Sequence, residues 1–255
     1  MNTSTPILQD DDAQTLMAGN YGYTAPQFAS LGSNEYTLAT IAVDVSGSVE
    51  PFHGDLENML KLCLEACKKS PRADNLMLRV LPFNHEVNQE LHGFRLLSGL
   101  NPNDYTKKLQ RPSGGTSLYD ATIATVEVTE KYGEDLVTQG ISANAVVFIV
   151  TDGCDEHSMS TLPQVTERLK RVVRDERIES IKVVLIGIYD KSTESRVVPR
   201  LEEFAKAAGI DQFVSMDRAK AGSFAKLAGF VSNSVSSTSQ ALGTGGPSKN
   251  LAATF

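Results

Sequence analysis

The chain has 255 residues, of which 41% are hydrophobic and 22% are charged, and its formal net charge is -7. This length allows one large α/β domain or two small domains, and the hydrophobic share is sufficient for a sizeable core. The negative charge argues against a protein that binds nucleic acid by placing Lys and Arg on phosphates, so we expect no nucleic-acid partner. No apolar stretch reaches the roughly 18 residues of a membrane-spanning helix. The first residues also lack the basic start and apolar run of a secretory signal, and we therefore expect a cytoplasmic protein without a membrane partner.

The first 35 residues mix polar, Gly and Pro residues with an acidic run at 10–12 and show no clear periodicity. They predict an irregular N-terminal leader. From Tyr36 onward, apolar runs with strand character alternate with segments of helical periodicity. The predicted strands cover residues 38–44, 76–83, 85–97 (as an edge strand), 145–150, 181–188 and 212–216. The predicted helices cover residues 56–71, 116–132, 161–177, 194–208 and 224–242.

A Gly-rich segment that begins at Gly243 is expected to stop the last helix and to start a flexible tail over residues 243–255. The alternation before it predicts one α/β domain over residues 36–242. We expect a Rossmann-like, doubly wound and mainly parallel sheet between helices, with one antiparallel edge strand. Residues 145–150 are continuously apolar, which is typical of a parallel strand covered on both faces.

Three segments far apart in the sequence, each interpreted as lying where a hydrophobic strand gives way to a loop, carry oxygen-bearing residues. They contribute Asp44, Ser46 and Ser48 from the first, Thr116 behind a glycine pair from the second, and Asp152 from the third. Because the carboxyl ends of parallel strands lie at one edge of a sheet, these side chains are expected to meet there. Two carboxylates and three hydroxyls suit a hard divalent cation. We predict Mg²⁺ or Mn²⁺, since a dedicated Ca²⁺ site commonly has more carboxylates.

Each segment alone is weak evidence, because Ser-Gly-Ser and Thr-Asp-Gly are common turn sequences. Nearby, Asp120 and Asp155 are candidates for charge or water contacts behind the ligands. Asp120 has an equally good alternative explanation as an acidic residue in the first turns of a helix. His157 is close to Asp152 in sequence, and we expect it to be exposed near the rim of the site.

The three segments together resemble the metal-ion-dependent adhesion site of von Willebrand factor A (vWA) domains, which consists of an Asp-x-Ser-x-Ser loop, a Thr and an Asp. These positions correspond to Asp44, Ser46, Ser48, Thr116 and Asp152, and all five match. The resemblance implies a vWA fold, metal ligation by these residues directly or through water, and a partner whose acidic side chain completes the coordination. Within the family, the chain looks most like the compact prokaryotic and phage members, because of the sequences of residues 35–38, 70–75 and 230–235. Those members resemble TerY-like proteins of tellurite resistance and stress.

The predicted function is therefore an intracellular adaptor that binds another protein through the metal, is not an enzyme, and is a monomer by itself. The alternative is a Mg²⁺-dependent phosphoryl-transfer or hydrolytic enzyme that uses Asp44. Dehalogenase-type phosphatases need a second carboxylate two residues after the nucleophile, where this chain has Ser46. A phosphate loop would need a Lys after the glycine pair, and none follows. A third possibility is an assembly component in which the ion only stabilises the fold.

The three cysteines form an odd and sparse set, as expected in a reducing compartment. Cys63 and Cys67 are four residues apart on a predicted helix, which indicates small core residues. Cys154 follows the predicted ligand Asp152 closely, but a soft thiolate is a poor ligand for Mg²⁺.

Overall fold

The computed structural model describes residues 13–87, 89–244 and 251–253. Its main element is a six-stranded sheet in the order β5-β4-β3-β6-β7-β8, in which β5 is antiparallel to β4 and all other pairs are parallel. The strands are β3 (Glu35–Asp44), β4 (Leu76–Phe83), β5 (His92–Leu96), β6 (Ser142–Thr151), β7 (Ile181–Tyr189) and β8 (Gln212–Asp217). The predicted α/β class, with a mainly parallel sheet and one antiparallel edge strand, is confirmed.

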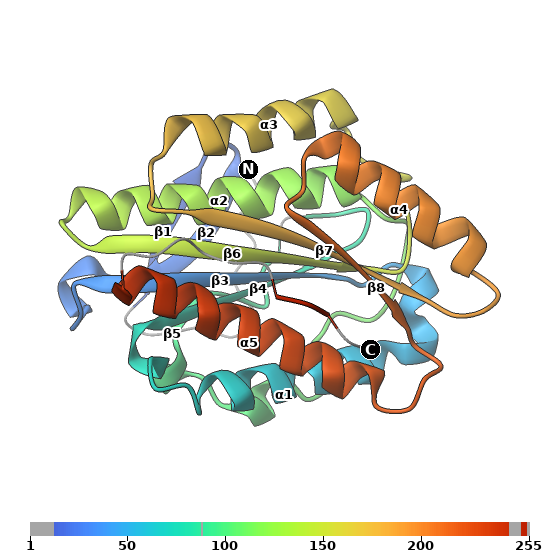
Figure 1. Cartoon of the computed structure of the whole chain (residues 1–255), viewed down its shortest axis with the longest axis horizontal. Coiled ribbons are helices and arrows are strands. Elements are labelled where there is room, and N and C mark those ends of the chain that lie inside the picture. Colours follow the sequence, from blue (N-terminus) through green and yellow to red (C-terminus); the bar gives the residue numbers. More distant parts are fainter. Residues whose placement is uncertain (1–12, 88, 245–250, 254–255) are drawn as a thin grey trace.

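Helices cover both faces of this sheet (Figure 1). One face carries α1 (His53–Cys67) and α5 (Ser223–Thr244), and the other carries α2 (Leu118–Thr138), α3 (Leu162–Asp175) and α4 (Glu194–Ala208). Successive residues of β3 supply both layers, since Ile41 and Val43 pack on the α1 and α5 side and Ala42 packs on the other. This is the two-residue period of a strand that is buried on both faces. Among the described helices, none combines the length and apolar character needed to cross a membrane.

The prediction of an irregular leader is wrong for residues 13–26, which form a β-hairpin. Strands β1 (Ala13–Ala18) and β2 (Tyr21–Pro26) pair around a two-residue loop whose first residue, Gly19, has φ of +55°. Glycine at this position is typical of a tight hairpin turn. The hairpin is part of the core, because Tyr23 is buried against Phe94 and Tyr132. The acidic run at 10–12 lies outside the described residues.

The hairpin is also tied to the sheet by a buried ion pair. Glu90 Oε1 accepts hydrogen bonds from the backbone N and the hydroxyl of Thr24, both at 2.8 Å. Its other oxygen pairs with Arg79 Nε at 2.9 Å, and both charged side chains are at most 5% exposed. Buried charges are tolerated only when they are paired in this way.

Several element boundaries also differ from the prediction, for example at the end of α2, which continues to Thr138 instead of residue 132. Gly243 does not end the last helix, since α5 continues to Thr244. In the predicted tail, Leu251 packs against the core and its carbonyl accepts a hydrogen bond from Gln212 Nε2 at 2.8 Å. Residues 245–250 and 254–255 lie outside the described residues. The edge strand covers only His92–Leu96 of the predicted 85–97.

Candidate metal centre

The site lies where the strand order reverses direction. From β3 the chain continues to β4 on one side and later returns to β6 on the other. Asp44 is the last residue of β3, and Asp152 directly follows the last residue of β6. Because β3 and β6 are parallel neighbours, with Val43 opposite Val150, the two aspartates leave the sheet at the same edge. Ligands of open α/β sheets commonly bind at such a reversal.

Backbone hydrogen bonds bring the second segment to the first. Gly47 N donates to Gly114 O at 3.0 Å, and Ser113 N donates to Val45 O at 3.0 Å. Gly114 has φ of +69°, a conformation that residues with a Cβ rarely adopt. The glycine pair therefore allows the loop before α2 to lie directly against the Asp-x-Ser-x-Ser loop.

A chain of hydrogen bonds joins the two carboxylates through the serines. Ser46 N donates to Asp44 Oδ1 at 2.8 Å, and the hydroxyls of Ser46 and Ser48 lie 3.1 Å apart. Ser48 Oγ donates to Asp152 Oδ1 at 2.7 Å. On the far side of Asp44, Thr151 Oγ1 donates to Oδ2 at 2.6 Å. Four of the five predicted ligands thus form one connected polar cluster, and Thr151 fixes Asp44 in it.

The fifth predicted ligand, Thr116, is buried beside the third segment. A Cβ atom added to Gly153 would lie 3.4 Å from Thr116 Oγ1. The Thr116 carbonyl accepts hydrogen bonds from the backbone N of Glu156 at 2.8 Å and of His157 at 3.1 Å. All five positions therefore share one end of the sheet.

The electrostatics of the cluster favour a cation. Asp44 is 1% exposed, and burial raises its pKa from 3.8 to about 6, although hydrogen bonds from Thr151 and Ser46 oppose that rise. Burial also raises the pKa of Asp152, against the lowering effect of the Ser48 hydrogen bond and of Arg218. Among the described residues, no Lys, Arg or His forms an ion pair with Asp44. A bound cation would offset the cost of placing the partly exposed Asp152 carboxylate next to the buried Asp44 carboxylate.

The chemistry of the donors fits a hard ion. The cluster offers carboxylate and hydroxyl oxygens, which Mg²⁺ and Mn²⁺ prefer. In the part of the chain that the structure describes, no group of three or more His, Cys, Asp or Glu side chains is arranged to hold a metal. The donor set is thus unlike the His and Cys clusters of structural zinc sites.

Two histidines border the glycine pair. A Cβ atom on Gly114 would lie 2.1 Å from His85 Nδ1, and one on Gly115 would lie 2.1 Å from His157 Nδ1. Both residues are exposed, as predicted for His157. His85 was not predicted, because no spacing in the sequence links it to the other segments. The rings explain why this loop needs two consecutive glycines.

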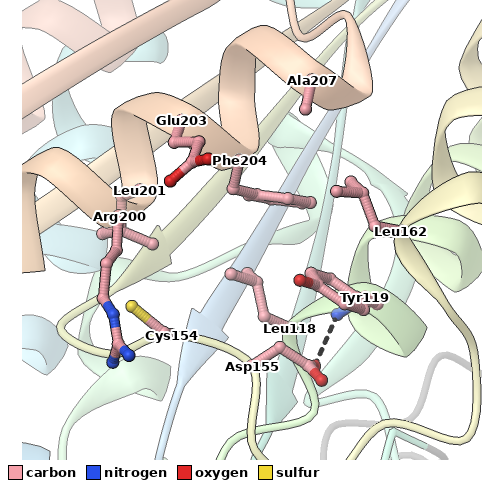
Figure 2. A pocket seen from close by; sticks show the side chains of 10 residues that line it. All are labelled: Leu118, Tyr119, Cys154, Asp155, Leu162, Arg200, Leu201, Glu203, Phe204 and Ala207. Carbon is pink, nitrogen blue, oxygen red and sulfur yellow. Dashed lines mark hydrogen bonds between the residues drawn. The ribbon is translucent and has the colours of Figure 1, made fainter.

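Asp120 and Asp155 hold the loop after β6 to the first turn of α2. Asp120 accepts hydrogen bonds from Met159 N at 2.8 Å and from Ser160 N at 2.9 Å. Asp155 Oδ1 accepts from Tyr119 N at 3.0 Å, a contact drawn in Figure 2. These carboxylates therefore fix the segment that follows Asp152. Asp120 lies in the first turn of α2, as the alternative explanation of this residue predicted.

The cysteines lie as the sequence indicates. Cys63 and Cys67 are buried in the core between α1 and the sheet, and Cys154 is half-buried near the site. All three are free thiols.

Comparison with known proteins identifies similar folds only. No family model matches the chain, and no curated protein matches it. Among solved structures, the chain is similar to a mutant of the PilB minor pilin from Streptococcus sanguinis, with a TM-score of 0.57 and 12% identity. It is also similar to the pilus adhesin SpaC from Lactobacillus rhamnosus GG, with a TM-score of 0.56 and 10% identity.

The similarity to the pilin covers 88% of this chain and 66% of the pilin, and that to the adhesin covers 80% and 31%. This chain thus spans two thirds or less of those proteins. At such identities the likeness concerns the fold alone. The mostly parallel six-stranded sheet with its antiparallel edge strand is consistent with a vWA-like Rossmann fold.

Proposed function

We propose that this protein binds Mg²⁺ or Mn²⁺ through Asp44, Ser46, Ser48, Thr116 and Asp152, and uses the ion to bind another protein. The observation that supports this most directly is the serine bridge between two carboxylates, one of which is fully buried and has no ion-pair partner among the residues that the structure describes. When bound, the cation would supply a positive centre that accepts a carboxylate oxygen of a partner Asp or Glu. A strong ionic contact over a small area can anchor an otherwise modest interface.

The residues of the chain have separate tasks in this proposal. Thr151 and the Ser46 backbone hold the orientation of the Asp44 carboxylate, and Ser48 holds that of Asp152. The Gly47–Gly114 hydrogen bond fixes the distance between the first two loops. Because these groups are already ordered by hydrogen bonds, little conformational freedom remains to be lost when a ligand binds.

We further infer that the site is a metal-ion-dependent adhesion site of vWA type and that the protein is a cytoplasmic adaptor of the TerY-like group. The five matching positions support the first inference. The second rests on the weaker sequence likeness of residues 35–38, 70–75 and 230–235. Fractionation of the source cells tests the location, and gel filtration tests the expected monomer.

Isothermal titration with Mg²⁺ tests the metal site. We expect one binding event in the wild type, none in Asp152→Asn, and an unchanged event in the control Glu156→Gln. Glu156 is exposed on the same loop but lies outside the predicted ligand set. Circular dichroism should be the same for all three proteins. Equal Mg²⁺ binding by Asp152→Asn would contradict the proposed ligand set.

Retention of cell proteins on the tagged chain tests the adaptor function. We expect a partner that is retained in Mg²⁺ but lost with a chelator and lost on Asp152→Asn. A partner that is indifferent to both changes would place the interface elsewhere and leave the ion a structural role. Turnover of a generic phosphoester that disappears in Asp44→Asn would instead favour the enzyme alternative.

A further inference from the structure

A hollow of about 370 Å³ lies next to the candidate metal centre, between the start of α2 and α4 (Figure 2). Its wall includes Tyr119 and Phe204, whose rings stack with centroids 5.1 Å apart and an interplanar angle of 30°. The remaining apolar lining comes from Leu118, Leu162, Leu201 and Ala207. A cavity of this size and character can accept one large non-polar side chain.

The hollow is continuous along the chain with two segments of the metal centre. Leu118 follows Thr116 by two residues, and Cys154 follows Asp152 by two residues. Since even a fully extended chain rises only about 3.3 Å per residue, the backbone of Cys154, which lines the hollow, is at most about 7 Å from that of Asp152. A partner segment bound at the metal therefore reaches the hollow within a few residues.

The edge of the hollow nearest the metal centre is basic. Arg200 extends from α4 toward Cys154, and the positive charges of Arg200 and Arg196 both act on that thiol (Figure 2). The charge of Arg196 also acts on Asp152. Two carboxylates line the hollow as well: Asp155, whose Oδ1 accepts a hydrogen bond from Tyr119 N, and Glu203, an exposed residue of α4 farther along the helix. The positive charge is therefore confined to the Arg200 end of the hollow.

An exposed methionine lies on the same loop. Met159 is 95% exposed, although its backbone is tied to α2 by the hydrogen bond to Asp120. It precedes Leu162, which lines the hollow, by three residues. A large apolar side chain held in solvent by an ordered loop is a feature of binding surfaces.

We propose that this surface binds an acidic segment of a partner protein, with one large non-polar side chain of that segment seated in the hollow. This rests on the proposed function, because the segment's first carboxylate binds the metal centre. A second carboxylate pairs with Arg200, and a Leu, Ile, Met or Phe a few residues away fills the space against Tyr119 and Phe204.

Fluorescence anisotropy with synthetic peptides on the full chain tests this inference in Mg²⁺. Each labelled peptide carries one Asp and one Glu in a Gly/Ser background, with a Leu placed one to four residues from the Asp, and each has a counterpart with Ser in place of Leu. Burying a leucine side chain should strengthen binding by about tenfold or more for at least one spacing. Replacing the Glu by Gln should weaken binding to the wild type but not to Arg200→Gln.

A matched pair of variants tests whether the preference for the Leu peptides arises in this hollow. Ala207→Trp fills the hollow from an exposed position of α4 and should abolish the preference for Leu. Lys206→Trp adds the same side chain to the neighbouring exposed position, outside the lining, and should keep the preference. A Leu preference that survives Ala207→Trp would overturn the assignment to this hollow.

Other outcomes separate this inference from the proposed function. Equal affinity of Leu and Ser peptides at every spacing, with binding still lost in chelator, overturns the inference and leaves metal-dependent binding in place. Binding that persists in chelator and in Asp152→Asn contradicts the proposed function itself. If no peptide binds at millimolar concentration, the inference of a linear acidic segment is wrong, while titration of the protein with Mg²⁺ alone still reports on the metal centre.

Discussion

Replacing Asp44 by Asn is expected to stabilise the metal-free protein at neutral pH, even though it removes a proposed ligand. Burial raises the pKa of Asp44 from 3.8 to about 6, so the native state binds more protons than the unfolded state between these values. The free energy of unfolding therefore falls as pH rises through that window. The rise in pKa corresponds to about 3 kcal/mol of lost stability at pH 7.5, as an upper limit.

The geometry allows Asn to replace Asp and keep the hydrogen bonds that Asp44 now forms with Ser46 and Thr151. An Asn carbonyl oxygen can accept the hydrogen bond that Ser46 N now donates to Asp44 Oδ1. The amide can donate to Thr151 Oγ1, whose own proton can turn to the Gly153 carbonyl at 3.1 Å. The substitution thus removes the buried charge and keeps the hydrogen bonds.

Urea denaturation in chelator and in Mg²⁺ measures the effect. In chelator at pH 7.5, Asp44→Asn should be more stable than wild type by about 1–3 kcal/mol, and the difference should shrink as pH falls from 6 to 4. Mg²⁺ should stabilise the wild type only. The control Asp190→Asn should lose stability, because hydrogen bonds from Ser192 and Arg218 hold the pKa of that partly exposed carboxyl low. A destabilised Asp44→Asn in chelator, or equal stabilisation of both proteins by Mg²⁺, would refute this reasoning.

Two further predictions concern the core. Glu90→Ala leaves Arg79 buried without its partner and should lower the free energy of unfolding, measured by urea denaturation, by about 3–5 kcal/mol. The control Glu167→Ala removes one member of an exposed ion pair and should lower it by less than about 1 kcal/mol. Similar losses in the two variants would contradict the role of burial. Burial lowers the pKa of His92 from 6.5 to about 4, so its contribution to stability is complete above pH 6.5 and is lost as pH falls toward 4. We expect His92→Gln to have a weaker pH dependence of unfolding over that range, and an unchanged dependence would count against it.

Long elements with a strong apolar period were predictable from the sequence. The predicted strand over residues 76–83 and the predicted helix over residues 194–208 coincide with β4 and α4. The candidate metal-site residues were identifiable for the same reason, since Asp44 and Asp152 each lie at the end of an apolar strand run. In an alternating α/β chain, such positions meet at one edge of the sheet whatever the strand order.

The N-terminal hairpin was missed because its strands are short and only four of their twelve residues are buried. The pair Gly19-Asn20 between the two strands was a usable turn signal. The strands themselves are held by residues far away in sequence, such as Glu90, which contacts Thr24 across 66 positions. A local pattern does not contain that contact.

The sequence by itself determined the α/β class and the residue types that could hold a hard cation, because strand and helix periods and ligand chemistry are local properties. Only the tertiary structure placed β3 beside β6, so that Thr151 holds Asp44 across 107 positions and Ser48 holds Asp152 across 104. It also placed two histidine rings on the glycine pair and formed a hollow between α2 and α4. These features depend on which distant side chains pack together, and packing is decided by the whole folded chain rather than by the preference of any segment.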